Sequence, residues 1–148
     1  MIQRVSISVE DVIRAAIHQS AQDFRALRAL KGSDMNLTYE DFVLTQDDAE
    51  AITTEIKNIS AQIYESIKGY VCQWYVDVEV CYYIKGEVCS NTVQSIIHNI
   101  LLYTILAWWF DFRLPDAAVT YREKASIQLS ALVGAVVPKF AKRKLRMF

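Results

Sequence analysis

Apolar residues repeat every three or four positions in the first quarter of the chain, which indicates a helix. The segment from Val9 to Leu30 places its apolar side chains on one helical face, and Glu10 and Asp11 fall in its first turn, where the helix dipole favours negative charge. Before it, Val5 and Ile7 alternate with polar residues, which is typical of a short strand. We therefore expect a short strand followed by a first helix from Val9 to Leu30.

A second amphipathic helix is predicted from about Gln46 to Lys68. Thr45 precedes it as a cap, with Asp48 at the capping-box position. Its apolar positions form one narrow stripe, which favours core packing against another helix over a seam for a partner: Ala49, Ile52, Ile56, Ile59, Ile63 and Ile67. The polar connection before it carries three apolar residues that we expect to pin it to the surface: Leu37, Tyr39 and Phe42.

The period changes to two between Val76 and Ile84, where β-branched and aromatic residues alternate with others. This pattern predicts a strand. A single strand is not stable in water, so it needs a partner. The partner could be the short N-terminal strand, a return of the chain after Gly86, or a neighbouring subunit.

The third predicted helix runs from about Thr92 to Phe112, with Ser90 or Asn91 as its cap. Its first half has a polar stripe, and its second half is apolar on almost every side, so we expect that half to be enclosed. The stripe comprises Asn91, Gln94, Ser95 and His98. The uninterrupted apolar run, Ile100 to Phe110, is shorter than the ~20 residues that span a membrane, so a membrane segment is only a minor alternative.

Trp108 and Trp109 point to different sides of this helix, because successive residues are about 100° apart. One tryptophan should face the other helices, and the other needs a second cover. Leu114 and Pro115 are expected to end the helix, and Asp116 to cap a fourth helix that kinks or stops near Val137.

These elements predict a mainly α fold, with a four-helix bundle-like core and a short β-strand or hairpin extension. The 148 residues suit a single domain. The last eleven residues, "PKFAKRKLRMF", contain five cations, so we assign 139–148 to a basic C-terminal arm. The arm could be a solvated helix end, a contact for anionic lipid or nucleic acid, or a docking segment for an acidic protein surface.

Composition narrows the possible functions. Formal net charge is −1, which does not suggest nucleic-acid binding by the whole chain. The three cysteines have no zinc-finger spacing, so we expect free thiols. No nucleophile elbow, phosphate loop or metal-binding helix motif is present, and His98 lies on a polar stripe. We therefore expect no enzymatic activity, no metal and no cofactor.

The order of these segments resembles a family of small tailed-phage proteins, the head–tail connectors (neck or adaptor proteins), particularly those of Bacteroides phages and prophages. The resemblance rests on four stretches and is strongest from Ser95 to Lys144: "DVIRAA", "TQDDAEAITTEIKNISAQIYESIKGYV", "SIIHNILLYTILAWWFDFRLPD" and "AVTYREKASIQLSALVGAVV". It implies a structural virion protein that forms a ring, usually twelvefold, at the head–tail interface after assembly in the host cytoplasm. Its partners would be the portal and other neck or tail proteins, and DNA would pass through the channel without sequence-specific binding.

For this function we expect partner contacts at seven residues: Trp74, Tyr82, Tyr83, Lys142, Arg143, Lys144 and Phe148. Two other functions remain possible. The apolar third helix and the basic arm would suit a peripheral membrane-associated protein, and a small helical regulator that binds another protein would have a similar composition.

Overall fold

The computed structural model describes residues 1–31 and 38–137, and it is mainly α-helical. Helices account for 72% of the structure, and a small antiparallel sheet accounts for its β part, so the predicted fold class is confirmed. In chain order the elements are β1 (Ile2–Ser8), α1 (Val9–Lys31), α2 (Tyr39–Phe42), η2 (Gln46–Asp48), α3 (Ala49–Ile67), η3 (Lys68–Tyr70), β2 (Val71–Val76), β3 (Glu79–Lys85), α4 (Ser90–Phe110) and α5 (Pro115–Val136).

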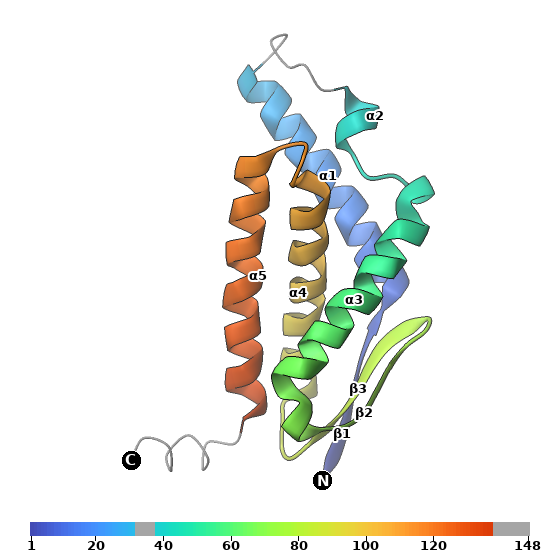
Figure 1. Ribbon diagram of the computed structural model, residues 1–148, viewed down its shortest axis with the longest axis vertical. Helices are drawn as coiled ribbons and strands as arrows, with labels where there is room; N and C mark the ends of the chain where they lie inside the picture. The colour runs from blue at the N-terminus through green and yellow to red at the C-terminus, as the bar shows by residue number, and fades with distance from the viewer. Residues whose placement is uncertain (32–37, 138–148) are drawn as a thin grey trace, which may run out of the picture.

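The helices are arranged around α4, which lies at the centre of the elongated molecule (Figure 1). α4 and α5 form an antiparallel pair with the most extensive contact in the structure, and α1 and α3 also pack on α4. The sheet lies beside α3 at one end of the molecule, and β1 contacts α4 while β2 contacts α3.

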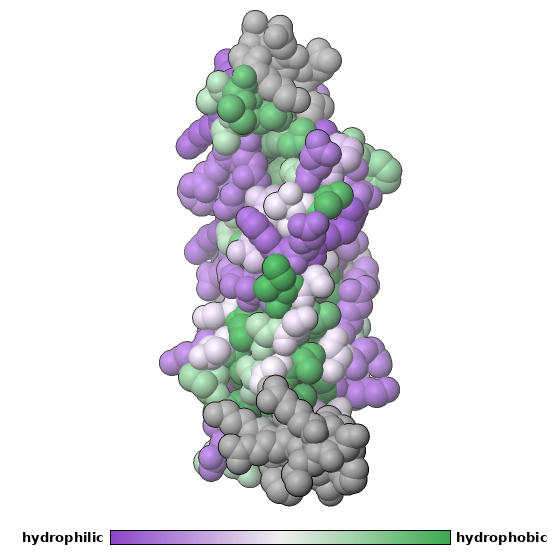
Figure 2. Space-filling view, turned by 90° about the vertical axis from the view of Figure 1, so that its left-hand side faces the viewer, coloured by the Kyte–Doolittle hydropathy of each residue, from purple (hydrophilic) through white to green (hydrophobic). Residues whose placement is uncertain are grey.

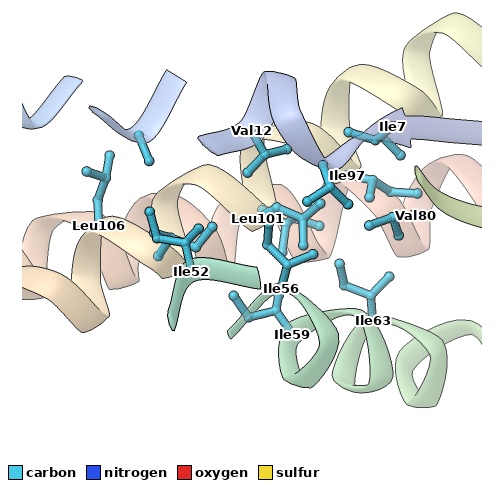
Figure 3. Close-up of a cluster of buried hydrophobic side chains, with 14 of the residues drawn as sticks. Ile7, Val12, Ile52, Ile56, Ile59, Ile63, Val80, Ile97, Leu101 and Leu106 are labelled. Atoms are coloured by element: carbon cyan, nitrogen blue, oxygen red, sulfur yellow. The ribbon is translucent and has the colours of Figure 1, made fainter. Parts of the chain in front are cut away.

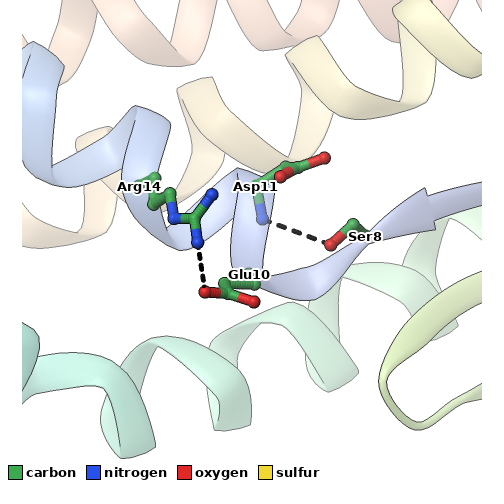
Figure 4. A network of polar contacts seen from close by, with 4 residues as sticks. All are labelled: Ser8, Glu10, Asp11 and Arg14. Atoms are coloured by element: carbon green, nitrogen blue, oxygen red, sulfur yellow. Dashed lines mark hydrogen bonds and ion pairs between the residues drawn. The ribbon is translucent and has the colours of Figure 1, made fainter.

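The helix α1 begins directly after β1 because Ser8 supplies a cap. The Asp11 backbone N–H donates to Ser8 Oγ at 3.4 Å, and Arg14 pairs with Glu10 one turn earlier (Figure 4). Both members of that ion pair are exposed, so it contributes only ~0.3–0.5 kcal/mol. These local contacts set where the helix begins, but they contribute little to overall stability.

Stability comes mainly from the apolar core, in which the isoleucine stripe of α3 meets α4, α1 and the sheet (Figure 3). Ile52, Ile56 and Ile63 are at most 1% exposed. Burying each such side chain contributes roughly 1.5–3 kcal/mol, which is several times the surface ion pair. The predicted stripe of this helix is therefore confirmed as core.

The sheet has the order β1-β3-β2, and both pairs are antiparallel. Val5 lies opposite Tyr82, and Trp74 lies opposite Tyr82 from the other side. The N-terminal strand is thus confirmed as a partner, and the pairing is within the subunit. The single strand expected from Val76 to Ile84 was wrong: the chain reverses around Asp77 and Val78, and Val78 is 75% exposed.

Three helix boundaries near α4 differ from the sequence expectations. The N-cap of α4 is Cys89, not Ser90 or Asn91, because the Val93 N–H already bonds to the Cys89 carbonyl. α4 ends at Phe110, and Pro115 begins α5 instead of ending α4. Proline is well suited to the first turn of a helix, where no N–H is needed. Asp116 lies in that first turn, and Leu114 takes the capping position.

The segment from Thr38 to Thr45 is tied to the top of the helical core. Phe42 is buried as expected, and the Trp109 Nε1–H donates to the Phe42 carbonyl at 2.6 Å. Tyr39 is half exposed with its ring against Phe24. Leu37 lies outside the described residues. Trp109 is therefore the enclosed tryptophan, whereas Trp108 is 37% exposed.

Within the residues that the structure describes, one helix, α4, is long and apolar enough to cross a membrane by length and composition, and half of that stretch is buried inside the protein. The same length and composition occur in the central helix of a water-soluble protein. Ile97, Leu101 and Ile105 of α4 are fully buried by the surrounding elements.

Candidate partner-binding surface

The structure separates the seven predicted contact residues into three groups. Trp74 and Tyr83 are half-buried on β2 and β3, and Tyr82 is fully buried between them. The remaining four, Lys142, Arg143, Lys144 and Phe148, lie outside the described residues.

Tyr82 is a core residue, so the expectation that it contacts a partner is corrected. Its exposed fraction is 0%, and its hydroxyl donates to the Ser60 carbonyl of α3 at 2.7 Å. Burial raises the pKa of Tyr82 well above its ordinary value. The ring of Trp74 stacks between Tyr64 and Tyr82, with centroids 5.5 Å and 6.1 Å away. This stack joins β2 and β3 to α3 and leaves Trp74 half-buried.

Tyr83 points to the opposite side of the sheet, because successive residues of a strand alternate between its faces. The register places it beside Arg4 of β1 and Gln73 of β2, and it places Tyr75 beside Cys81. We call this side the outer sheet face, defined by Arg4, Tyr75, Glu79, Cys81 and Tyr83.

Polar contacts hold the outer sheet face together around Arg4. The Arg4 guanidinium donates to Glu79 Oε2 at 2.8 Å. Hydrogen bonding with Tyr75 and then Tyr83 raises the pKa of Arg4. Cys81 lies fully buried under this layer, while Tyr75 remains 38% exposed. The face thus combines two tyrosine side chains with the Arg4–Glu79 ion pair.

The helices pack on the other side of the sheet, where β1 contacts α4 and β2 contacts α3. Among residues 1–31 and 38–137, no helix covers the outer sheet face (Figure 1). Tyrosine and arginine are enriched at protein–protein interfaces because they offer large contact areas with polar tips. The chemistry of this face therefore suits binding to another protein.

Sequence reasoning found Tyr83 but missed Arg4 and Tyr75. The signal was present in the alternation "QWYV", which places Gln73 and Tyr75 on one face and Trp74 on the other. It was overlooked because the turn at Asp77 and Val78 lacks the glycine or asparagine that usually marks a hairpin. Without such a turn signal, the period-two pattern alone does not separate the two strands.

A second surface feature is a shallow polar groove between the β1–α1 junction and the first half of α4. Its volume is about 600 Å³, and its lining is mostly polar: Ile7, Ser8, Asp11, Asn91, Gln94, Ser95, His98 and Asn99. The predicted polar stripe of α4 is thus placed on this groove, with His98 half-buried in its wall. Within the described residues, no three potential metal ligands cluster together.

The three cysteines are free, and each has a different environment. Cys81 is buried, whereas Cys72 and Cys89 are exposed. The Thr92 hydroxyl donates to Cys89 Sγ at 3.2 Å, and this hydrogen bond lowers the pKa of the Cys89 thiol.

Comparisons with known proteins identified no relative. No protein-family model matches the chain, and neither the curated proteins nor the solved structures contain a match.

Proposed function

We propose that this protein is a non-catalytic structural subunit of a tailed-phage head–tail connector, assembled as a ring that joins the portal to the tail. It would be located in the virion after assembly in the host cytoplasm. It would bind neighbouring proteins and extend the DNA channel. The resemblance of the segment order supports this proposal, and the observation that carries it is the uncovered outer sheet face.

The outer sheet face supports protein binding because aromatic and charged side chains lie together on one exposed side of the sheet. Tyr75 is 38% exposed and Tyr83 is half-buried, and the register places both on the same side of the sheet as Arg4. The side chains of Arg4 and Glu79 are each about half exposed, at 48% and 45%, so solvent screens their ion pair and it contributes little to folding. Because this ion pair adds little to the stability of the subunit, a role in contacts with other proteins is favoured.

The distribution of charge also supports the proposal. Residues 1–137 contain eleven basic and seventeen acidic side chains, a net charge of −6, and 138–148 add five cations and no acid. An acidic body repels DNA phosphates, so DNA would pass without being held. The basic arm, in contrast, would be attracted to an acidic surface of a neighbouring protein.

The test is binding to the portal protein encoded in the same genome. Full-length protein should co-purify with portal rings and add a further ring of density in electron micrographs. Tyr75→Ala should weaken this binding by about 30-fold, equivalent to ~2 kcal/mol, as for an aromatic interface hot spot. Phe112→Ala is the matched control, because Phe112 is 92% exposed in the turn between α4 and α5 and lies outside the outer sheet face.

Deleting 139–148 tests the arm. The truncated protein should keep its circular dichroism spectrum and melting temperature but bind the portal more weakly, and the difference should shrink at high salt, which screens charges. Unfolding of the truncated protein would instead make these residues part of the core. Sedimentation of the intact protein with anionic lipid vesicles would favour the membrane-associated alternative.

A further inference from the structure

The strand β1 forms one edge of the sheet, and it is the edge that is open to further pairing. The order β1-β3-β2 places β1 and β2 at the two edges. β2 pairs with β3 through a register shift between Val71 and Gln73, and an irregularity of this kind protects an edge from another strand. β1 pairs with β3 without a shift from Ile2 to Ser8. A regular edge such as β1 can accept a further strand.

The hydrogen bonds of β1 show which of its backbone groups point outward. Directly after β1, the Val9 N–H donates to the Val78 carbonyl at the other end of the hairpin turn. Because the bonded pairs alternate in an antiparallel ladder, Ile7 also bonds to β3, whereas Arg4 and Ser6 direct their N–H and C=O groups away from the sheet. In the described part of the chain, no backbone group bonds to Arg4 or Ser6 on that side.

The polar groove beside β1 lies on this open side. Its volume is about 600 Å³, and its lining comes from β1, α1 and α4, with no residue of β3, the strand on the other side of β1. Among the described residues, the polar side chains that α4 places in the groove form no hydrogen bond with other groups of the protein: Asn91, Gln94, Ser95, His98 and Asn99. Asp11 is the carboxylate of the described lining, and it lies on the side of α1 that faces α4 (Figure 4).

We propose that β1 and this groove bind an extended segment of another protein, which adds to the three-stranded sheet antiparallel to β1. The row of outward N–H and C=O groups specifies the backbone of the bound segment, because an extended chain matches its two-residue repeat. An antiparallel direction is favoured because both existing pairs of the sheet are antiparallel. The site uses the backbone of β1 and side chains of α4 instead of the outer sheet face, so it does not depend on the connector function.

The groove also specifies the side chains of the bound segment. In antiparallel pairing, the residues opposite Arg4 and Ser6 bond to β1 and direct their side chains to the outer side of the sheet. The residues between them direct their side chains toward α4, where they meet amides, a hydroxyl, an imidazole and the Asp11 carboxylate. Hydroxyl and basic side chains suit these partners. The bound segment therefore alternates β-branched residues with threonine, serine or lysine.

A fluorescently labelled peptide in which valine alternates with threonine and one central lysine tests the site on the full-length protein. We expect binding in fluorescence anisotropy and shifted NMR signals for the Arg4 and Ser6 amides. N-methylation of the valines, whose N–H groups would face β1, should weaken binding at least tenfold, whereas N-methylation of the threonines should change it by no more than about twofold. Absence of binding at about 1 mM peptide would overturn the proposal, as would equal losses for the two methylated peptides.

Two variants test the site from the side of the protein. Ser6→Pro removes an outward N–H, and proline is tolerated at such a position of an edge strand, so the variant should keep its circular dichroism spectrum and bind the peptide at least tenfold more weakly. Ser95→Trp fills the groove from an exposed position of α4 and should weaken binding by a similar factor. This second variant leaves β1 unchanged, so it tests the site even if the proline variant does not fold.

Ser130→Trp is the matched control for the groove. Ser130 is also an exposed serine of a helix, but it belongs to α5, on the side of the molecule that Figure 2 views, and the sheet lies on the opposite side (Figures 1 and 2). This variant should bind the peptide like the wild type. A loss equal to that of Ser95→Trp would overturn the proposal.

A photo-crosslinking amino acid in place of Gln94 identifies the occupant of the groove. Crosslinks to the added peptide support the proposal. Crosslinks to a second copy of this chain, or within one chain, that excess peptide does not displace would overturn it, because the groove would then already be filled by this protein itself. Binding to the portal is measured separately, so loss of portal binding with intact peptide binding would count against the connector function alone.

Discussion

At the scale of single residues, a few buried polar groups join segments that are far apart in the chain. Ser20 Oγ of α1 accepts the Leu44 backbone N–H at 3.0 Å and donates to the Ile17 carbonyl. Tyr82 joins the sheet to α3 in the same way. Leaving such a group without its partner costs more than the hydrogen bond itself contributes, so these positions are sensitive to substitution.

Tyr82→Phe should destabilise the protein by about 1 kcal/mol, because it removes the hydrogen bond to the Ser60 carbonyl and leaves the ring in place. Urea denaturation at pH 7 measures this difference. Tyr83→Phe is the matched control on the outer sheet face, and its cost should be below about 0.5 kcal/mol. Equal costs for the two variants would contradict the assignment of Tyr82 to the core.

The stability difference between the wild type and Tyr82→Phe should also depend on pH. Burial raises the pKa of Tyr82 above the value of about 10 that it has in the unfolded chain. The unfolded state therefore loses this proton first as pH rises, and its contribution to stability is full below pH ~10 and declines above it. The difference in unfolding free energy between the wild type and Tyr82→Phe should accordingly shrink above pH ~10. Urea denaturation at a series of alkaline pH values measures this difference. A difference that stays constant across these pH values would contradict the prediction.

At the scale of elements, the turns decide how strands and helices connect. The chain leaves β3 through Gly86, whose φ of 95° lies in the left-handed region that side chains rarely adopt. The Gly86 N–H also bonds to the Met1 carbonyl, which fixes the start of β1 against the end of β3. The helix that follows this turn, α4, packs against β1.

Gly86→Ala should cost at least about 1 kcal/mol through backbone strain alone, because no atom lies within 4 Å of the added methyl group. Gly69→Ala is the control. Its surroundings are equally open and its φ is not in the left-handed region, so the substitution should be neutral or stabilise by up to ~1 kcal/mol. Thermal unfolding of both variants measures the difference, and an equal effect at the two glycines would show that conformation at Gly86 does not matter.

At the scale of the whole molecule, one continuous core runs from the sheet through the helices. Val5 and Tyr82 of the sheet belong to the same buried cluster as Phe42, Leu106 and Phe110 at the other end of the helical core. A shared core of this kind makes it costly to unfold the sheet alone.

The protein should therefore unfold as one cooperative unit. Variants that retain only Trp74, in the sheet, or only Trp109, beside Phe42, should show fluorescence transitions in urea that coincide with each other and with circular dichroism. Separate midpoints for the two tryptophans would mean that the sheet is an independent folding unit.

Periodicity in the sequence was sufficient for the long elements and for the fold class. The buried stripe of α3 follows from apolar spacing, because an amphipathic helix packs its apolar face into the core. The second half of α4 is enclosed only in part, since Trp108 is 37% exposed and Leu102 to Thr104 are half-buried. The capping box at Thr45 and Asp48 was also predicted from local pattern, and it begins the short turn Gln46–Asp48. The basic arm was assigned from composition, and its residues lie outside the described part of the chain.

Tertiary structure alone decided the sheet and the candidate site. A period of two cannot distinguish one strand from two strands joined by a turn, so Tyr82 could be assigned to the core only after β2 and β3 were paired. Arg4 and Tyr75 are 71 positions apart and share one side of the sheet because β1 and β2 flank β3. The sequence by itself determined which helices form and which faces they bury, since those preferences are local. Which residues face outward together depended on strand register, which is set by contacts between distant segments.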